Sequence, residues 1–397
     1  MTLPGKAASN DTEPVALLTI LHEWGRIGCI GFGGPPTHIK LLRDLCVDRK
    51  QWLGPAEFED AVAACNLLPG PASTQLAIFC AWRLHGRTGA VIGGAAFIIP
   101  GLILILALAA LFLGSSPPRW ILAAGAGAGA AVAAVAVHAA AGLMPASWRA
   151  AKASDRARRL RWISYLAAGV LAAATLGPWL VLVLLGCGAI EVTTRISRGT
   201  PSHAAVAPFS LAASGVIAAG GLASLIWVAF KVGALSYGGG FVIIPLMQAD
   251  AVSHYHWMTG GQFLNAVALG QITPGPVVQT VAVVGYAAAG LGGGILAALI
   301  AFSPSFAFIL LGARHFDRLR SNHTARAFLD GAGPATIGAI FGSAIPLALA
   351  LAEPWQYAIL GAAAVLLLVL RRSVVLTLLL AAAAGIIAAA VGAALPR

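Results

Sequence analysis

The sequence has 397 residues, of which 59% are hydrophobic and only 10% charged, with a formal net charge of +11. Because soluble proteins carry about 25% charged residues, this composition excludes a soluble globular protein and indicates an integral membrane protein. The basic excess does not indicate a nucleic-acid partner. Many Lys and Arg residues gather in two short loops, 147–162 and 313–326, as cytoplasmic anchors of membrane helices do.

Residues 1–14 carry one Lys against two acids and predict a short cytosolic tail without the basic lead of a signal peptide. After this tail, apolar stretches of at least about 18 residues are long enough to span a membrane as helices. In chain order they lie at 15–33, 61–83, 88–113, 119–144, 162–190, 209–235, 263–288, 291–313, 331–352 and 355–394. They lack the alternation of barrel strands, so the predicted fold class is an all-α membrane protein with about ten transmembrane helices. Gly177-Pro178 and Arg371-Arg372 leave open a division of the fifth and the last stretch.

The chain repeats itself. Sliding the sequence by 205 residues, the distance from Pro69 to Pro274, superimposes two Pro-Gly-Pro segments and two Gly-Gly pairs, and without a gap it places Phe97 on Phe302. Chance similarity between apolar helices would not keep Gly, Pro and Trp in one register. We therefore expect two homologous transporter repeats.

The charges of equivalent loops predict that the two repeats are inverted. The loop after the Pro-Gly-Pro segment is basic in the first repeat (82–87) and uncharged in the second (287–293), and the next loop reverses this difference. Positive charge marks the cytoplasmic side, so equivalent loops are expected on opposite sides. The expected domains are the tail 1–14, a first repeat 15–194, a linker 195–208 and a second repeat 209–397.

The interrupted helices predict a binding site for an anion. Proline inside a helix removes one N–H donor and clashes with the preceding turn, and the helix that restarts points free N–H groups and a partial positive charge into the gap. Inverted repeats with such breaks occur in secondary transporters. The alternative is a kink that serves packing alone. The residues expected to contact the anion at the breaks are Gly33, Gly34, Asn66, Pro69, Gly70, Pro71, Ser73, Gly238, Gly239, Gln271, Pro274, Gly275 and Pro276.

Two cations, Arg26 and Lys231, are equivalent under the shift, and each precedes a Gly-Gly pair. A basic residue at a helix centre costs roughly 2.5–3.5 kcal/mol, which favours a role as countercharge for an anionic substrate. For Arg26 the alternatives are a pair with Glu23 or snorkelling, whereas Lys231 has no acid within a turn. His22 and Glu23 are candidates for proton coupling, against the ordinary role of hydrogen-bonded packing residues.

Motifs of soluble enzymes are absent, including the Walker A, HExxH and GxSxG patterns. The five cysteines are scattered and form no CxxC, so neither a disulfide framework nor a thiol-based metal site is expected. His254 and His256 give only a weak indication of a metal site, and a polar loop is the alternative. We expect no enzymatic activity, no cofactor and no bound metal.

The segments "FGGPPTHI", "NLLPGPASTQ" and "QITPGPVVQT" resemble those of the chromate ion transporter family. The resemblance covers nearly the whole chain. It implies a two-domain protein of the bacterial inner membrane, with halves of opposite orientation, that expels chromate at the expense of the proton gradient and gives chromate resistance. Carried over by motif, Phe32 and Pro35 join the glycines and Pro-Gly-Pro segments named above. Gly240-Phe241 replaces the first repeat's Pro35-Pro36, so the halves are not expected to be equivalent.

The residues themselves indicate an anion, and only the resemblance indicates chromate. A sulfate-like oxyanion transporter, or an importer of the same architecture, is the main alternative, because chromate and sulfate are both tetrahedral dianions. A membrane-embedded chromate reductase would need a redox cofactor or a positioned thiol pair. The expected partners are the oxyanion and the lipid bilayer, and a homodimer is left open.

Overall fold

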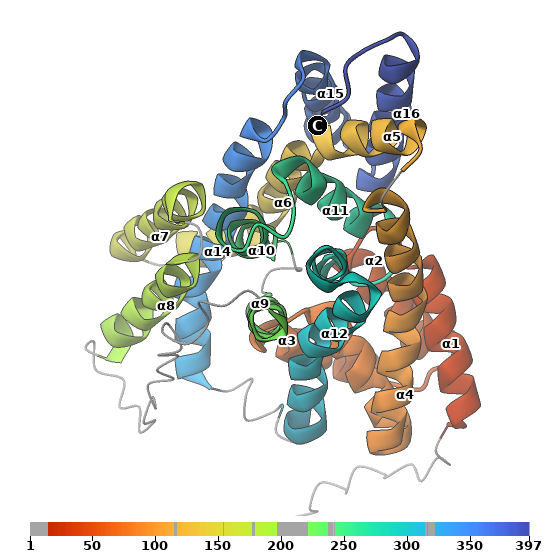
Figure 1. The fold of residues 1–397 in the computed structure, drawn as a ribbon. Helices are drawn as coiled ribbons and strands as arrows, with labels where there is room; N and C mark the ends of the chain where they lie inside the picture. Colours follow the sequence, from red (N-terminus) through yellow and green to blue (C-terminus); the bar gives the residue numbers. More distant parts are fainter. Residues whose placement is uncertain are drawn as a thin grey trace, which may run out of the picture.

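The computed structural model describes residues 15–114, 117–153, 155–176, 179–196, 221–236, 241, 243–313, 316 and 322–396. All regular structure in these residues is helical, which confirms an all-α protein (Figure 1). In the described part of the chain, four helices are long and apolar enough to cross a membrane: Ala72–Phe112, Arg119–Lys152, Val277–Gly312 and His323–Leu349. Shorter apolar helices accompany them. The chain is a multi-pass membrane protein.

Two helical hairpins open the first half, and glycine or proline breaks each of them at its tip. Their elements are α1 (Leu17–Ile30), α2 (Pro35–Arg43), the π-helix η1 (Asp44–Arg49), α3 (Pro55–Leu67) and α4 (Ala72–Phe112). In the first hairpin the chain returns alongside α1, so that Trp52 stacks on Trp24 with ring centroids 6.4 Å apart. In the second hairpin, Arg83 near the end of the first arm of α4 forms an ion pair with Glu57 at the start of α3.

α4 turns back on itself at His85 and Gly86. Their φ/ψ angles are −149°/30° and 60°/−149°, both outside the helical region. Gly94 lies against Ile78 of the arm before the turn, so the two arms, 72–84 and 87–112, run antiparallel. At about 1.5 Å per residue the first arm is too short to cross a bilayer, whereas the second is long enough.

The second half repeats these elements in the same order. They are α9 (Leu222–Leu235), α10 (Ile243–Gln248), the π-helix η4 (Ala249–His254), α11 (Gly260–Ile272), the 3-10 helix η5 (Val277–Gln279) and α12 (Thr280–Gly312). Backbone angles agree at equivalent points. Gln51 and His256 both have φ of 52°, and α12 turns at Ala289 and Gly290 with φ/ψ of −152°/33° and 63°/−157°. The sequence repeat is therefore accompanied by a repeat of backbone conformation.

The second half is one residue shorter directly after its Pro-Gly-Pro segment. The glycines of the two segments are 205 residues apart, but the turns at Gly86 and Gly290 are only 204 apart. The 3-10 helix η5, which has no counterpart in the first half, occupies the place of the missing residue. The prediction of a register without gaps is wrong, and Phe97 corresponds to Ala301 instead of Phe302.

The two halves meet along the second arms of α4 and α12. Gly94 faces Phe306, while Gly294 faces Leu106, so a residue early in one arm meets a residue late in the other. The two arms therefore run antiparallel, and the turns that precede them lie at opposite ends of this pair.

The remaining helices pack across the boundary between the halves. They are α5 (Arg119–Ala130), α6 (Val132–Lys152), α7 (Arg156–Thr175), α8 (Leu180–Ile196), α14 (His323–Leu349), α15 (Pro354–Ala364), the π-helix η7 (Val365–Val369) and α16 (Val374–Ala390). α14 packs on α7 and α8, and α16 packs on α5 (Figure 1). Glycines allow close approach, since Gly338 lies against the Leu166 carbonyl and Gly127 against that of Ala381.

The predicted spans differ from the observed helices in two places. The stretch 162–190 divides into α7 and α8 between Thr175 and Leu180, and the stretch 355–394 divides between η7 and α16. Gly177-Pro178 lie outside the described residues. The helix is interrupted in both places, and whether each part crosses the membrane stays a prediction. The stretch 61–83 comprises two hairpin arms around the break instead of one continuous helix. The total of about ten crossings therefore stays a prediction.

Candidate functional site

The breaks of the two halves contact each other. The Gly275 N–H donates to the Gly31 carbonyl at 3.0 Å, which joins the second Pro-Gly-Pro segment to the tip of the first hairpin. Gly70 lies beside the Gly233 carbonyl and the Ser305 hydroxyl, both from the second half. Each Pro-Gly-Pro segment thus contacts the other half. In secondary transporters the substrate binds at such an interface, near the membrane midplane.

Two glutamines in equivalent positions donate hydrogen bonds to backbone carbonyls beside these breaks. Gln75 Nε2 donates to the Pro69 carbonyl at 2.7 Å, and Gln279 Nε2 donates to the Ile98 carbonyl at 2.8 Å. Both side chains are buried, and among the described residues neither Oε1 atom has a hydrogen-bond partner. Because each amide nitrogen is bonded to a carbonyl, a flip of the amide would place two acceptors together. Each glutamine therefore leaves an acceptor free.

Buried polar atoms without a hydrogen-bond partner gather at the breaks. Eight such side-chain atoms occur in the described part of the chain. Six belong to residues at or against the breaks, here called the polar cluster: Thr74, Gln75, Ser236, Gln271, Gln279 and Ser305. Each unpaired buried group costs about 1–3 kcal/mol. The Oε1 atoms of Gln75 and Gln279 only accept hydrogen bonds and cannot bind an anion, whereas the other four atoms can donate and point to a ligand with acceptor oxygens. Its three hydroxyls and the Gln271 amide nitrogen supply the donors that an oxyanion needs.

Backbone donors accompany the polar cluster at the first Pro-Gly-Pro segment. The N–H groups of Thr74 and Gln75 donate back to the Pro71 carbonyl. The N–H groups of Ala72 and Ser73 precede them, at positions where a helix has no acceptor of its own. α2 differs, because it starts with Pro35-Pro36, which lack N–H groups. The Pro-Gly-Pro restart is the better anion site of the two.

Sequence patterns did not indicate His38, which is fully buried between two breaks. Its Nε2 lies 2.8 Å from the Gly31 carbonyl and its Nδ1 lies 3.2 Å from the Ser73 hydroxyl. Since a carbonyl only accepts, Nε2 carries the hydrogen, and in a neutral ring Nδ1 accepts from Ser73. His38 thus joins the Gly-Gly break to the Pro-Gly-Pro restart. The available signal was the position of His38 on the arm that directly follows the Gly-Gly break.

Arg26 and Lys231 are equivalent in sequence but differ in environment. Arg26 Nε lies 3.3 Å from Glu23 Oε2, an ion pair without hydrogen-bond geometry, and its side chain is 41% exposed. This is the pair that the spacing predicts as an alternative. Lys231 is buried and bonded to Asp250 of η4 on the returning arm of its hairpin. Lys231 is therefore paired, although no acid lies within one turn of it in the sequence.

The remaining predicted site residues have different environments. Asn66 is exposed, whereas its equivalent Gln271 is buried with a free Nε2, so only Gln271 joins the polar cluster. His22 is exposed on α1. Gly33 is exposed, and Gly34 is buried near Val277 of the second half. Gly238 and Gly239 lie outside the described residues.

Three of the five cysteines are brought together by the first two hairpins. Cys46, Cys65 and Cys80 are buried, and the Cys46 and Cys80 thiols lie within hydrogen-bonding reach. These three cysteines, which are far apart in the sequence, are thus neighbours in the fold. All are free thiols.

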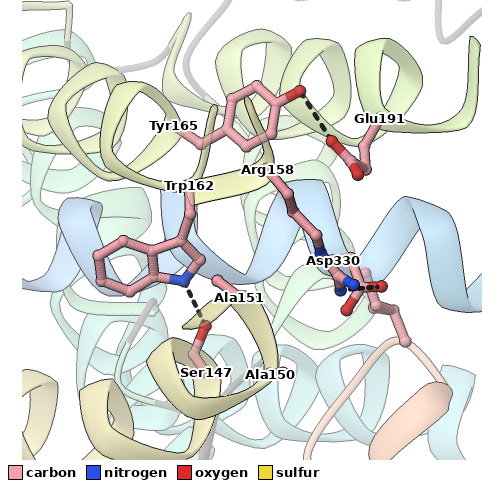
Figure 2. A pocket seen from close by; sticks show the side chains of 9 residues that line it. Ser147, Ala150, Ala151, Arg158, Trp162, Tyr165, Glu191 and Asp330 are labelled. Carbon is pink, nitrogen blue, oxygen red and sulfur yellow. Dashed lines mark hydrogen bonds and ion pairs between the residues drawn. The ribbon is translucent and has the colours of Figure 1, made fainter. Parts of the chain in front are cut away.

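A small pocket of about 50 Å³ lies where α6, α7, α8 and α14 meet (Figure 2). Arg158 pairs with Asp330 at 2.8 Å, and the Tyr165 hydroxyl donates to Glu191 at 3.2 Å. The pocket residues are Ser147, Ala150, Ala151, Arg158, Trp162, Tyr165, Glu191, Leu329 and Asp330. Because its charges are already paired, we interpret the pocket as part of an ion-pair clamp between α7, α8 and α14, and not as an anion site.

Glu191→Gln is expected to destabilise this clamp. The Glu191 side chain is 2% exposed and accepts from Arg161 at 2.8 and 3.2 Å, and also pairs with Arg195. Removing one partner of a buried pair costs roughly 3–5 kcal/mol, and the partial exposure of the arginines favours the lower end. Glu59→Gln, which removes an exposed pair with Arg43, is the control and should cost about 0–1 kcal/mol. Thermal unfolding in detergent measures both, and equal melting temperatures would contradict the clamp.

Comparison with known proteins shows the family to which the chain belongs. The sequence model of a family described as "Chromate transporter" matches residues 18–192 and 223–386, and each matched range contains one set of breaks. The chain is 34% identical to a chromate transport protein of Cupriavidus metallidurans, over 86% of this chain and 85% of that protein. It is 29% identical to a chromate transport protein of Pseudomonas aeruginosa, over 88% and 86% of the two chains. No solved structure is significantly similar to it.

Proposed function

The chain belongs to the chromate transporter family, a family of transporters and not of enzymes, and from that premise we propose that it exports chromate through the polar cluster. One observation carries the proposal: unpaired buried donors gather where the broken helices of both halves meet. A transporter releases its ion in every cycle, so the groups that bind the ion must also exist without a bound partner. Unpaired donors at an interface between two halves fit this requirement.

In this proposal the oxyanion accepts hydrogen bonds from donors of both halves. The first half supplies Thr74 and the N–H groups at the start of α4, and the second half supplies Gln271 and Ser305. The helix N-terminus adds a partial positive charge. Because the donors are divided between the halves, rocking of one half against the other would open the cluster to alternate sides of the membrane.

We propose that the two halves have inverted orientations in the bacterial inner membrane, with the N-terminus in the cytoplasm. Two observations support this. The second arms of α4 and α12 run antiparallel, as the contacts of Gly94 and Gly294 require. The turn of α4 has Arg83 and Arg87 beside it, whereas the equivalent turn around Gly290 is uncharged. The positive-inside rule then assigns the turn of α4 to the cytoplasm.

Accumulation of labelled chromate in cells with and without the gene tests the direction of transport. An exporter lowers accumulation, whereas higher accumulation indicates an importer. In inverted vesicles, an imposed proton gradient should accelerate chromate uptake if the gradient drives export. Excess sulfate in the same assay tests the alternative substrate, because a sulfate-like transporter would be inhibited by it.

A further inference from the structure

The second Pro-Gly-Pro segment is hydrogen-bonded to the first half in two places. Its Gly275 N–H donates to the Gly31 carbonyl at 3.0 Å, and Gln279 Nε2 donates to the Ile98 carbonyl at 2.8 Å. Both acceptors are backbone carbonyls, one at the tip of the first hairpin and one on the second arm of α4. We call a segment with these two bonds docked, because they fix it to the opposite half.

The first Pro-Gly-Pro segment has neither of these bonds, and we call it open. Its Gly70 N–H is buried and has no hydrogen-bond partner among the described residues. Gln75 Nε2 donates to the Pro69 carbonyl of its own segment instead of crossing to the other half. Because an unpaired buried N–H is costly, the open segment offers an anion a donor that the docked segment has already used.

The two segments also contact the opposite half at different positions. Gly275 bonds to Gly31, and the repeat pairs Gly31 with Ser236. A Cβ at Gly70 would lie 3.3 Å from the Gly233 carbonyl, which precedes Ser236 by three residues. The contact of the open segment therefore lies nearly one turn earlier than that of the docked segment, which is about 4.5 Å along the helix.

The helix arms that join the two halves pack symmetrically, so they do not account for this difference. Gly94 of α4 faces Phe306 of α12, and the two arms run antiparallel. Counting four positions along each arm from this contact places Ile98 opposite Phe302. These two residues are 204 apart, which is the spacing of the two turns, so they are equivalent. The difference lies in the segments, and the same arms can support an arrangement in which the segments exchange roles.

We propose that the two segments alternate between the docked and the open position during transport, and that only the open segment gives its glycine N–H to the anion. This proposal rests on the proposed function. In the exchanged arrangement the Gly70 N–H donates to the Ser236 carbonyl, and Gln75 Nε2 donates to the Phe302 carbonyl. Gly275 is then open. When a segment docks, a backbone carbonyl of the opposite half takes the place of the anion and releases it. One-turn shifts of packed elements are an established form of conformational switch.

Two enlarged side chains favour opposite arrangements. Ala72 and Val277 are equivalent, since each directly follows the second proline of its segment. Val277 is buried, and a Cβ at Gly34 of the first half would lie 3.6 Å from its Cγ2. Val277→Phe should therefore expel the second segment from its docked position, and Ala72→Phe should prevent the first segment from docking. Val91→Phe enlarges an exposed side chain on the second arm of α4 and is the control.

Hydrogen exchange of the Gly70 and Gly275 amides, followed by NMR of the full-length protein labelled at glycine, reports which segment is docked. In Val277→Phe the Gly70 amide should exchange at least about fivefold more slowly than in the wild type, because the first segment docks and gains a hydrogen bond. The Gly275 amide should exchange faster. Ala72→Phe should keep Gly275 slow and Gly70 fast, and Val91→Phe should behave as the wild type.

Unchanged or faster exchange at Gly70 in folded Val277→Phe would overturn the proposal, because the first segment would then have no docked position. If Val277→Phe does not fold, Val277→Leu applies the same test with a smaller side chain. Chromate added to the wild type should slow exchange at Gly70. If chromate affects neither amide while Val277→Phe still exchanges the two segments, the proposed function is contradicted and the alternation is not.

Discussion

Gly70→Ala is expected to reduce chromate transport by more than about tenfold, because it distorts the first Pro-Gly-Pro break. Gly70 has φ of 115°, a conformation that costs an L-residue roughly 1–3 kcal/mol. A Cβ there would lie 2.7 Å from Gln75 Nε2 and 3.4 Å from the Ser305 hydroxyl. It would therefore displace the bond from Gln75 to the Pro69 carbonyl and move two members of the polar cluster.

Gly86→Ala provides a control for backbone strain. Gly86 has φ of 60° at the turn of α4, and a Cβ there would meet nothing within 4 Å. Both variants carry a strained residue, but only Gly70→Ala disturbs the polar cluster. Chromate transport, normalised to the amount of folded protein in the membrane, should therefore fall only for Gly70→Ala. Equal losses would mean that the break is a structural kink.

Gln271→Leu is expected to stabilise the empty protein while it weakens transport. The Gln271 side chain is buried and its Nε2 has no partner among the described residues, so replacing it removes a desolvation cost of about 1–3 kcal/mol. A hydrogen bond to a charged group contributes about 1.5–3 kcal/mol, so losing it should lower chromate affinity roughly 10–100-fold. Melting temperature and transport should thus change in opposite directions.

Thr336→Val is the matched control for this variant. Thr336 is also buried with an unpaired hydroxyl, but it lies on α14 and belongs to no break. Its replacement should raise the melting temperature without changing transport. If Gln271→Leu behaves in the same way, the unpaired amide is a packing defect and not a substrate donor.

Local sequence patterns predicted the features that depend on short spacing. The Pro-Gly-Pro segments have equivalent backbone conformations, with φ of 115° at Gly70 and 97° at Gly275. Arg26 and Glu23, three residues apart on α1, form the pair that helix geometry favours. These features need only the chain's own periodicity, so one sequence was sufficient to find them.

The contacts between hairpin arms could not be predicted from the spacing of residues in the sequence. Asp250 reaches Lys231 across 19 residues, and His38 reaches Ser73 across 35. Neither separation corresponds to a helical repeat, since the tip of each hairpin fixes which residues meet. The one-residue slip after the second Pro-Gly-Pro segment arises likewise from η5, whose tighter winding the composition does not indicate. The contact between the halves that brings Ser305 against Gly70 was therefore not predicted.

The two halves share a backbone but differ in chemistry. The first half begins its returning arm with Pro35-Pro36 and places His38 between its breaks. The second half has the buried Lys231–Asp250 pair and the free amide of Gln271. The departure of Gly240-Phe241 from the first repeat predicted such inequivalence. The second half thus contributes the charge that an anion would use, while the first contributes neutral donors.

Counterflow of labelled chromate tests the central claim most directly. Purified protein in liposomes preloaded with unlabelled chromate should transiently accumulate labelled chromate without any other energy source, because a carrier exchanges substrate across one alternating site. Gly70→Ala should suppress this accumulation, and Gly86→Ala should retain it. If correctly folded wild-type protein shows no counterflow, or if Gly70→Ala matches it, the chain does not carry chromate through the breaks between its halves.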